Sequence, residues 1–319
     1  MTVPYIMKKT VLALQVLCIL LFFTLPVLSG CKKLPPEGTK IVLTTGMPDD
    51  VVFYIEDTVC TVPEFRVYLE DIRSGYENNF GSDIWEVDTG TVPMGEMLRH
   101  LCLSHITKIK IIGLFAAEEG IFLDTAEQNA AASKGRSYFA SLSDEELEAM
   151  GNPTEELLVQ IMTENALAGK FYEYMVKDIN PEISDDEARR ITVEQIETAD
   201  YETAYEIKSL LAEGRSFEEL MTEFGSGRNG TISFGKGEAD PLSEEAAFRL
   251  EQGQVSGIIE TENGYVIYKC ISTFNREETE TNKERILNER RQEGFFREYD
   301  AYAATKTRIM NEKVWESIK

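Results

Sequence analysis

The sequence predicts an α+β fold in which a small mixed unit is inserted into a mostly helical domain. Capped amphipathic segments fill most of residues 62–190, which is the pattern of packed helices. Residues 191–273 instead mix alternating strand patterns with short helical ones. A last helical segment carries an apolar stripe that needs a partner. We therefore expect both ends of the chain to build one helical domain.

The composition excludes several classes of function. The 319 residues are 43% hydrophobic and 28% charged, as in folded soluble proteins. The formal net charge of −24 works against binding polyanionic nucleic acid. Two histidines and five cysteines are too few for a multi-site metalloprotein or a dense disulfide scaffold. We expect no metal, no cofactor and no nucleic-acid partner.

Residues 1–30 have the layout of a secretory signal peptide. Lys8 and Lys9 precede the uncharged run Thr10 to Gly30. The run ends in Leu-Ser-Gly-Cys, which resembles the lipobox of bacterial lipoproteins. The resemblance implies that Cys31 is lipidated and becomes the first mature residue. An uncleaved anchor helix is the alternative, since about 20 apolar residues span a bilayer. Both readings place the chain outside the cytoplasm, tethered to a membrane.

A short spacer and a pair of strands are expected next. Residues 31–40 contain paired prolines and a glycine, as in a stiff linker. The N-terminal domain is predicted for residues 41–190, starting with a hairpin of Val51 to Ile55 and Thr58 to Val62. An odd number of cysteines remains after Cys31, so we interpret the rest as buried thiols: Cys60, Cys102 and Cys270.

Helices are predicted through the remainder of this domain. The Thr61-x-x-Glu64 capping box begins a helix that should run to about Ser74 and Gly75. A long amphipathic helix follows from Pro93 to Glu119, and Gly120 ends it. Further helices are expected at Thr125 to Ser141, Asp144 to Met150 and Pro153 to Lys177, with a short capped piece at Ser184.

The inserted unit is predicted for residues 191–273. Its expected elements are a strand at 191–197, helices at 201–213 and 217–224, a strand at 231–234, a helix at 242–250 and a hairpin at 258–271. The hairpin should turn at Asn263 and Gly264. Residues 274–319 are expected to be a C-terminal helix packed on the N-terminal domain, with Phe295, Tyr299, Tyr302 and Ile309 on one stripe.

A family resemblance is carried by the inserted unit. Its motifs, in order, are SFEEL (216–220), NG (229–230), FGKG (234–237), EEAAF (244–248), GQVSGI (253–258) and NGYVIYK (263–269). Together they resemble the parvulin family of peptidyl-prolyl cis-trans isomerases over about a quarter of the chain. With the lipobox and the flanking helices, the whole is similar to lipid-anchored parvulin foldases of Gram-positive bacteria and related periplasmic chaperones. The resemblance implies a chaperone for exported proteins.

The catalytic positions that the resemblance implies are substituted. Isomerising an X-Pro bond means lowering a barrier of about 18–20 kcal/mol by desolvating and twisting the amide. Parvulins supply two histidines for this, and these positions fall at Gln195 and Val266. The loop that brings an Asp or Cys in the family is shortened here to Gly225-Ser226-Gly227-Arg228. The resemblance therefore implies weak or lost catalysis, with an active enzyme acting through a rearranged site as the alternative.

The substrate cup implied by the resemblance is partly kept. The family's Met and Phe fall at Ala239 and Ser243, whereas Ile232 and Phe234 retain apolar character. These four residues are the candidate substrate-binding positions. A separate hypothesis is that Phe295, Phe296, Tyr299 and Tyr302 line a groove for unfolded segments, and helix packing is the alternative.

Other residue patterns favour structural roles. His100 and His105 lie about 140° apart on the long helix, so they cannot face one metal, and His105 is expected to be a satisfied core histidine. The acidic clusters at 144–146 and 185–187 stand at helix N-termini and indicate capping rather than a calcium loop. The glycine-rich run 225–237 lacks the Gly-Lys-Ser/Thr ending of a phosphate-binding loop.

The sequence thus predicts a lipid-anchored foldase or chaperone on the extracytoplasmic face of a bacterial membrane. Its expected partners are unfolded or extended exported polypeptides, together with the membrane through the lipid on Cys31. An active peptidyl-prolyl isomerase is the first alternative. A solute-binding lipoprotein is a third class, and it would need two lobes of repeated βαβ units.

Overall fold

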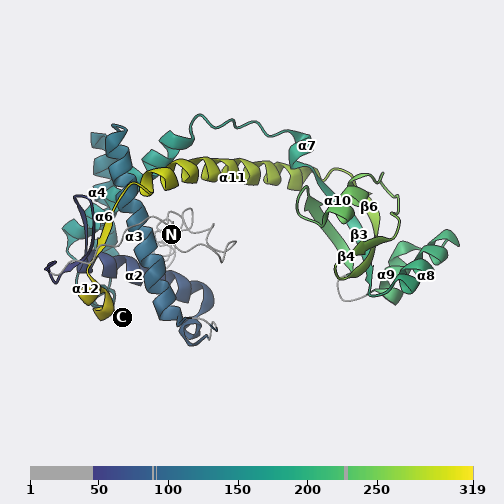
Figure 1. Ribbon diagram of the computed structural model, residues 1–319, viewed down its shortest axis with the longest axis horizontal. Coiled ribbons are helices and arrows are strands. Elements are labelled where there is room, and N and C mark those ends of the chain that lie inside the picture. Colours follow the sequence, from purple (N-terminus) through teal and green to yellow (C-terminus); the bar gives the residue numbers. More distant parts are fainter. Residues whose placement is uncertain (1–45, 88–89, 91, 226–228, 319) are drawn as a thin grey trace, which may run out of the picture. The chain divides into compact units, whose positions relative to one another are not determined.

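The computed structural model describes residues 46–87, 90, 92–225 and 229–318, which form two compact units (Figure 1). The first unit contains the described residues up to Lys177 and those from Phe295 onward. The second unit is Asp178–Gly294. The predicted α+β fold is confirmed, because both parts of the chain that flank the insertion belong to one helical unit. The predicted signal peptide, linker and lipidation site at Cys31 lie outside the described residues.

The first unit is a helical domain with a three-stranded sheet. Its strands are β1 (Val51–Ile55), β2 (Thr58–Thr61) and β7 (Arg308–Met310). Its helices are α2 (Val62–Phe80), η2 (Ser82–Glu86), α3 (Met94–Glu118), α4 (Thr125–Ser141), α5 (Asp144–Ala149), α6 (Glu155–Val176) and α12 (Glu312–Ser317), together with the last turns of α11 (Arg276–Ala303). The predicted capping box at Ser143 forms, and a further one forms at Asp124. At the predicted Thr61 box only the Thr61 side chain takes part, accepting the Glu64 N–H, because the Glu64 carboxylate pairs with Lys110 instead.

Helix α2 is longer than the sequence indicates. It continues past Gly75 and ends at Gly81, whose φ of 80° only glycine adopts readily. The extra turn is held by an aromatic cluster, in which the Tyr76 ring lies 6.2 Å from that of Trp85 in η2. Trp85 Nε1 also donates a hydrogen bond to Glu77 at 2.6 Å. Tertiary contacts therefore override the low helix propensity of the glycine.

The C-terminal segment is not one helix, so that part of the prediction is wrong. Helix α11 ends at Ala303, and Arg308–Met310 pairs antiparallel with β1, with Met310 opposite Phe53. The sheet order is β2-β1-β7. Asn311 then donates its backbone N–H to Val52 O at 2.9 Å and caps α12 with its side chain. Ile309 thus lies in a strand and not on the helical stripe.

Helix α3 is the centre of the core of this unit. It packs against α2 and α6, and α4 packs against α6. By length and composition alone α3 is apolar enough to cross a bilayer, yet half of its most apolar window is buried inside the unit. It is the only such helix among the described residues. Helices α4 and α6 approach closely at Gly135, where an added Cβ would lie 2.6 Å from the Cα of Val159.

Two expectations about side chains in this unit are resolved by the structure, one for His105 and one for the aromatic residues of α11. His105 is buried as expected, and burial lowers its pKa to about 4. No described residue gives its Nε2 a hydrogen bond, so it is not a satisfied histidine. The proposed groove of aromatic residues on α11 is helix packing: Phe295 is buried 5.1 Å from the Tyr172 ring, and Tyr302 stacks on Phe115 at 4.1 Å. Cys60, Cys102 and Cys270 are buried free thiols, as predicted.

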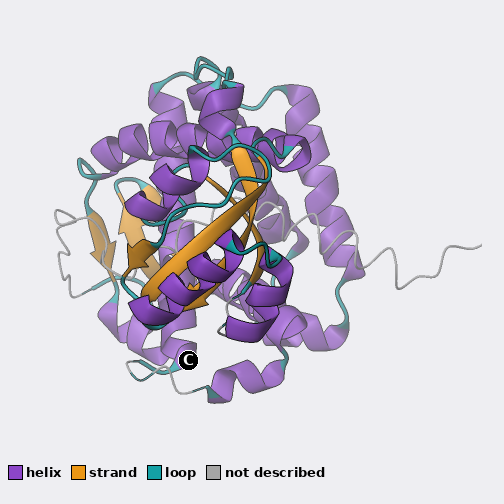
Figure 2. Ribbon diagram, turned by 90° about the vertical axis from the view of Figure 1, so that its right-hand side faces the viewer, coloured by secondary structure: helices purple, strands orange, loops and turns teal. Residues whose placement is uncertain are grey.

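The second unit is a four-stranded antiparallel sheet with helices packed beside it (Figure 2). Its strand order is β4-β3-β6-β5. Its elements are α7 (Asp185–Ala188), β3 (Arg190–Thr198), α8 (Tyr201–Ala212), α9 (Phe217–Phe224), β4 (Gly230–Gly235), α10 (Pro241–Phe248), β5 (Ile259–Thr261), β6 (Gly264–Ser272) and the first turns of α11. The β5-β6 turn is at Glu262 and Asn263, one residue earlier than predicted, because Thr261 pairs with Gly264.

Polar contacts attach the start of α11 to the sheet of the second unit. Arg190 donates from its backbone N–H to Thr279 Oγ1 at 3.1 Å and from Nε to Glu278 at 2.9 Å. Asn282 donates to the carbonyl of Ala188 at 2.9 Å. These contacts explain why the unit is wider than residues 191–273 and reaches Gly294.

We predict that Met310→Asp selectively destabilises the first unit. Met310 is 7% exposed and pairs with β1, so the substitution buries an unpaired charge and should cost about 3 kcal/mol or more. Both tryptophans of the chain, Trp85 and Trp315, lie in this unit, so urea unfolding followed by tryptophan fluorescence reports on it alone. Met310→Leu is the matched control and should cost less than about 1.5 kcal/mol. Equal midpoints for the two variants would contradict the packing of β7.

Candidate functional site

The sheet of the second unit has two differently covered faces. One face packs against α8 and α9 through a cluster of Ile196, Ala204, Ile207, Phe217, Leu220 and Ile267. The other face packs against α10 and is called the α10 face here. Its buried cluster is Ile191, Val193, Phe234, Ala247, Leu250, Ile259, Val266, Tyr268 and Cys270.

The strands bring four of the predicted site residues onto the α10 face. Residues directly opposite one another in antiparallel strands project to the same side of the sheet. Ile232 lies opposite Val193, and Phe234 lies opposite Ile191. Gln195 lies opposite Tyr268, and Val266 is part of the same buried cluster. Every second residue of a strand projects to the same face of the sheet, so residues that are far apart in the chain lie together on the α10 face.

The other two predicted residues reach this face from α10 and the segment before it. Ala239 is partly buried and packs against the cluster. Ser243 is completely buried in the first turn of α10. The turn is fixed because Asp240 caps the helix, accepting the Ser243 N–H at 3.0 Å. All six described candidates of the sequence prediction thus belong to one face.

Tyr268 is the main residue of this face that the sequence reasoning missed. It is 5% exposed, and its ring lies 6.1 Å from that of Phe234. Burial raises the pKa of its phenol, which lies near Ser243. The hydroxyl is therefore neutral at physiological pH. The signal was present in the sequence, because Tyr268 follows Val266 by two residues on one strand.

The base of the shortened loop is held by Asn229. Its side chain donates to Met221 O at 3.3 Å and accepts the Glu197 N–H at 2.9 Å, which links α9 to β3. Gly225 lies so close that an added Cβ would meet Asn229 Nδ2 at 1.2 Å. Residues 226–228 of the predicted loop lie outside the described residues.

The α10 face is closed and carries neutral polar groups. Gln195, Val266, Ser243 and Tyr268 are 7%, 2%, 0% and 5% exposed. Both histidines of the chain are in α3 of the first unit, so the second unit has none. A prolyl ring needs open apolar space, and here the phenol of Tyr268 lies beside Ser243. Only Ile232 and Ala239 of the candidates remain partly accessible.

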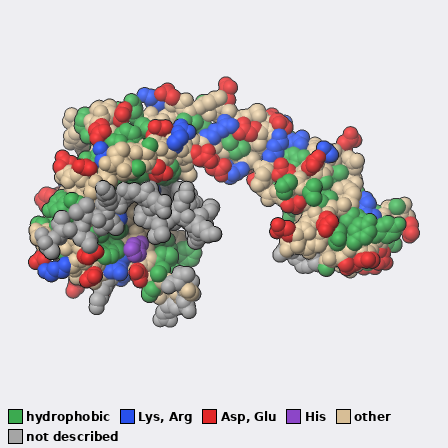
Figure 3. All heavy atoms as spheres, viewed as in Figure 1, with side chains coloured by type: hydrophobic (Ala, Val, Ile, Leu, Met, Phe, Trp, Pro, Cys, Tyr) green, Lys and Arg blue, Asp and Glu red, His purple; other side chains and the backbone are tan. Residues whose placement is uncertain are grey.

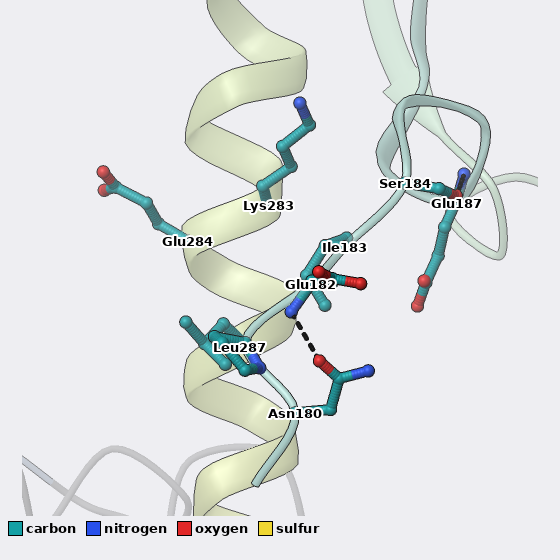
Figure 4. Close-up of a pocket in the computed structure, with 9 residues that line it drawn as sticks. Asn180, Glu182, Ile183, Ser184, Glu187, Lys283, Glu284 and Leu287 are labelled. Carbon is teal, nitrogen blue, oxygen red and sulfur yellow. Dashed lines mark hydrogen bonds between the residues drawn. The ribbon is translucent and has the colours of Figure 1, made fainter.

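A pocket of about 660 Å³ lies elsewhere in the second unit, between the segment Asn180 to Ser184 and α11 (Figure 4). Asn180 Oδ1 accepts the Glu182 N–H at 3.0 Å, which shapes its wall. Lys283 is paired with Asp185 at 2.5 Å, so its charge is neutralised locally. None of the residues that line the pocket belongs to the α10 face. Among the described residues, no group of three or more His, Cys, Asp or Glu is placed to hold a metal.

Comparison with known families identifies the inserted unit. Residues 185–272 match the family model described as Rotamase, PPIC-type PPIASE domain. The chain therefore carries a parvulin-type domain. The match includes α7 and the whole sheet of the second unit, and thus every candidate residue of the α10 face.

Relatives with similar sequences are named foldases. The parvulin domain and its surroundings are 34% identical over 110 residues to Foldase protein PrsA of Geobacillus kaustophilus, which covers 33% of this chain and 36% of that protein. Foldase protein PrsA of Caldanaerobacter subterraneus is 23% identical over 274 residues, 79% of this chain and 84% of the relative. The chain covers 30 to 37% of the length of the PrsA foldases of Geobacillus kaustophilus, Geobacillus sp. strain WCH70 and Bacillus subtilis.

Solved structures with similarity to the chain include a peptidylprolyl isomerase, PrsA, from Bacillus cereus. It is 17% identical, has a TM-score of 0.40, and covers 89% of this chain and 93% of its own. PrsA from Bacillus subtilis is 18% identical with a TM-score of 0.27, covering 78% of this chain and 88% of its own.

We predict that Gly264→Ala loosens the parvulin domain. Gly264 has a φ of 130°, and an added Cβ would lie 2.3 Å from the Thr198 carbonyl oxygen. The substitution should cost at least about 2 kcal/mol. Amide hydrogen exchange in β3 and β6 should then become roughly 30-fold faster.

Gly257→Ala is the matched control for this prediction. Its added Cβ meets nothing within 4 Å, and its φ is not positive. It should change exchange in the same strands by less than about fivefold, a cost below about 1 kcal/mol. Similar exchange rates in the two variants would show that the β5-β6 turn does not require a glycine at position 264.

Proposed function

We propose that the protein is a membrane-anchored, extracytoplasmic chaperone that holds exported polypeptides, and that its parvulin domain retains little or no isomerase activity. The observation that carries this proposal is the closed α10 face. The positions implied to be histidines are Gln195 and Val266, and both are buried beside Tyr268. The names of the relatives, Foldase protein PrsA, support a role in folding.

The chemistry of the α10 face supports weak or lost catalysis. Val266 has no polar group, and Gln195 carries an amide that cannot change charge. The cup residues Ala239 and Ser243 are small, and Ser243 lies against the phenol of Tyr268. A proline ring would have to displace this packed phenol before it reached Phe234. On the α10 face, only Ile232 and Ala239 are therefore accessible to an extended segment.

The membrane attachment in this proposal rests on the sequence. The charged-then-apolar leader and the Leu-Ser-Gly-Cys motif support lipidation of Cys31. With residues 1–30 removed, two lysines and no acidic residue are lost, so the net charge falls from −24 to −26. An anionic bilayer would repel such a body, and a covalent lipid is the attachment that overcomes this. A mature chain that carries an unmodified Cys31 would contradict this part of the proposal.

An active peptidyl-prolyl isomerase is the second candidate function. It is favoured by the match of residues 185–272 to the isomerase family model. The solute-binding lipoprotein is not supported, because both described sheets are antiparallel and lack the repeated βαβ units of that class.

We predict that the full chain in non-ionic detergent suppresses aggregation of a chemically unfolded protein such as citrate synthase. At an equimolar ratio, light scattering should fall by at least about half without nucleotide, since a holding chaperone needs only to bind apolar segments. Serum albumin at the same concentration controls for crowding and for nonspecific adsorption. Scattering that matches the albumin control would count against a holding function.

A further inference from the structure

Helix α8 carries exposed aromatic residues on the side of the sheet away from the α10 face. Tyr201 and Tyr205 are 49% and 61% exposed, and their rings lie 6.4 Å apart, one helical turn from each other. The ring of Tyr265 in β6 lies 5.6 Å from that of Tyr201. Figure 3 shows hydrophobic side chains, bordered by acidic ones, at the end of the second unit where Figure 1 places α8 and α9.

Acidic side chains run beside these rings. Glu202 and Glu206 are exposed and one turn apart on α8, next to the tyrosine stripe. Glu260 is exposed and lies directly opposite Tyr265 in the β5-β6 pair, so both project to the same side of the sheet. We call these residues the tyrosine-glutamate surface: Tyr201, Glu202, Tyr205, Glu206, Glu260 and Tyr265.

The carboxylates of this surface are not neutralised within the described chain. None of Glu202, Glu206 and Glu260 forms an ion pair or a hydrogen bond from its side chain with a described residue. Lys208, the lysine of α8, instead donates to the carbonyl oxygen of Ser256 at 2.7 Å. Like charges one turn apart on a helix are mildly destabilising. Glu202 lies in the first turn, where it favours the helix dipole, but this gives no reason for a second carboxylate at Glu206.

Some exposed carboxylates of the domain are paired, whereas others, such as Glu213 and Glu262, form no ion pair with a described residue. Glu223 lies 2.6 Å from Arg215, Asp186 lies 2.8 Å from Lys236, and Glu289 lies 2.6 Å from Arg285. The tyrosine-glutamate surface is distinguished by its unpaired carboxylates lying next to the exposed rings of Tyr201 and Tyr205. This is the chemistry that attracts guanidinium and ammonium groups, through the ring quadrupole and through charge-assisted hydrogen bonds.

We propose that the tyrosine-glutamate surface binds extended polypeptide segments that contain arginine or lysine. The proposal rests on the proposed function in one respect, that the domain meets extended client segments. Charge excludes other occupants: a second copy of this chain carries −24 and would be repelled, as would nucleic acid or an anionic bilayer. Basic segments of clients would thus dock on the face of the sheet opposite the closed α10 face.

The test is fluorescence anisotropy of a labelled decapeptide of alternating arginine and glycine, titrated with the full chain in non-ionic detergent. Tyr201→Ala/Tyr205→Ala should weaken binding at least about tenfold, and Glu202→Gln/Glu206→Gln at least about fivefold. Raising the salt from about 50 to about 300 mM should weaken binding further, because the charges are exposed. A decapeptide of alternating glutamate and glycine should not bind.

Two control variants separate this surface from general charge attraction. Asp144→Asn/Glu148→Gln removes the same two charges from an exposed pair one turn apart on α5 in the first unit. Leu242→Ala removes an apolar side chain that is 60% exposed on α10. Both should bind the arginine peptide within about twofold of the unaltered chain. Thermal unfolding of every variant establishes that the fold is retained.

Each outcome of the peptide titrations either supports or overturns binding at the tyrosine-glutamate surface. Absence of binding to the arginine peptide, or equal weakening in the α5 and α8 charge variants, overturns the proposal. Weakening by the glutamate pair alone, with no effect of the tyrosine pair, also overturns it, because the rings would then play no part. The aggregation assay is an independent test. Holding activity without peptide binding would refute only the binding role of the tyrosine-glutamate surface. Peptide binding without holding activity would refute only the proposed function.

Discussion

The pairing of β7 with β1 is the contact on which the first unit depends. Met310 lies opposite Phe53, and Asn311 donates to Val52 while capping α12. Two further side chains after the strand, Val314 and Ile318, are buried in the same unit. Because the chain leaves this unit after Lys177 and returns at Phe295, the sheet closes only after the inserted domain has been made. The helical unit therefore requires the last residues of the chain for its stability.

We propose that an insertion of this kind lets the parvulin domain change its catalytic site while it keeps its fold. The sheet has its own two cores, and the strained turn at Gly264 and the cap of Asp240 position β6 and α10 without any catalytic group. On the α10 face, Tyr268 lies beside Ser243. The large side chain of Tyr268 therefore fills space that the small side chains of Ala239 and Ser243 leave open. Close packing of this kind retains stability where an open cup would leave a cavity.

Much of the fold follows from local signals in the sequence. Capping residues such as Asp124, Ser143 and Ser216 fix helix starts, and the period of two in β3 and β6 assigns residues to sheet faces. Strand β7 was missed because three residues carry too little pattern and their partner lies about 250 positions earlier in the chain. The packing of Tyr268 against Ser243 was missed for the same reason, since it joins elements that no local pattern connects.

We propose that the parvulin fold is present in this chain and that its isomerase activity is weak or lost. The most direct measurement is NMR exchange spectroscopy on a short Ala-Pro peptide with the full chain in non-ionic detergent, compared with peptide alone. Uncatalysed exchange takes tens to hundreds of seconds, so acceleration is easily seen. We expect exchange within about twofold of the peptide alone, because the α10 face is closed and has no histidine. Clear exchange cross-peaks that grow with protein concentration would contradict it and identify an active enzyme.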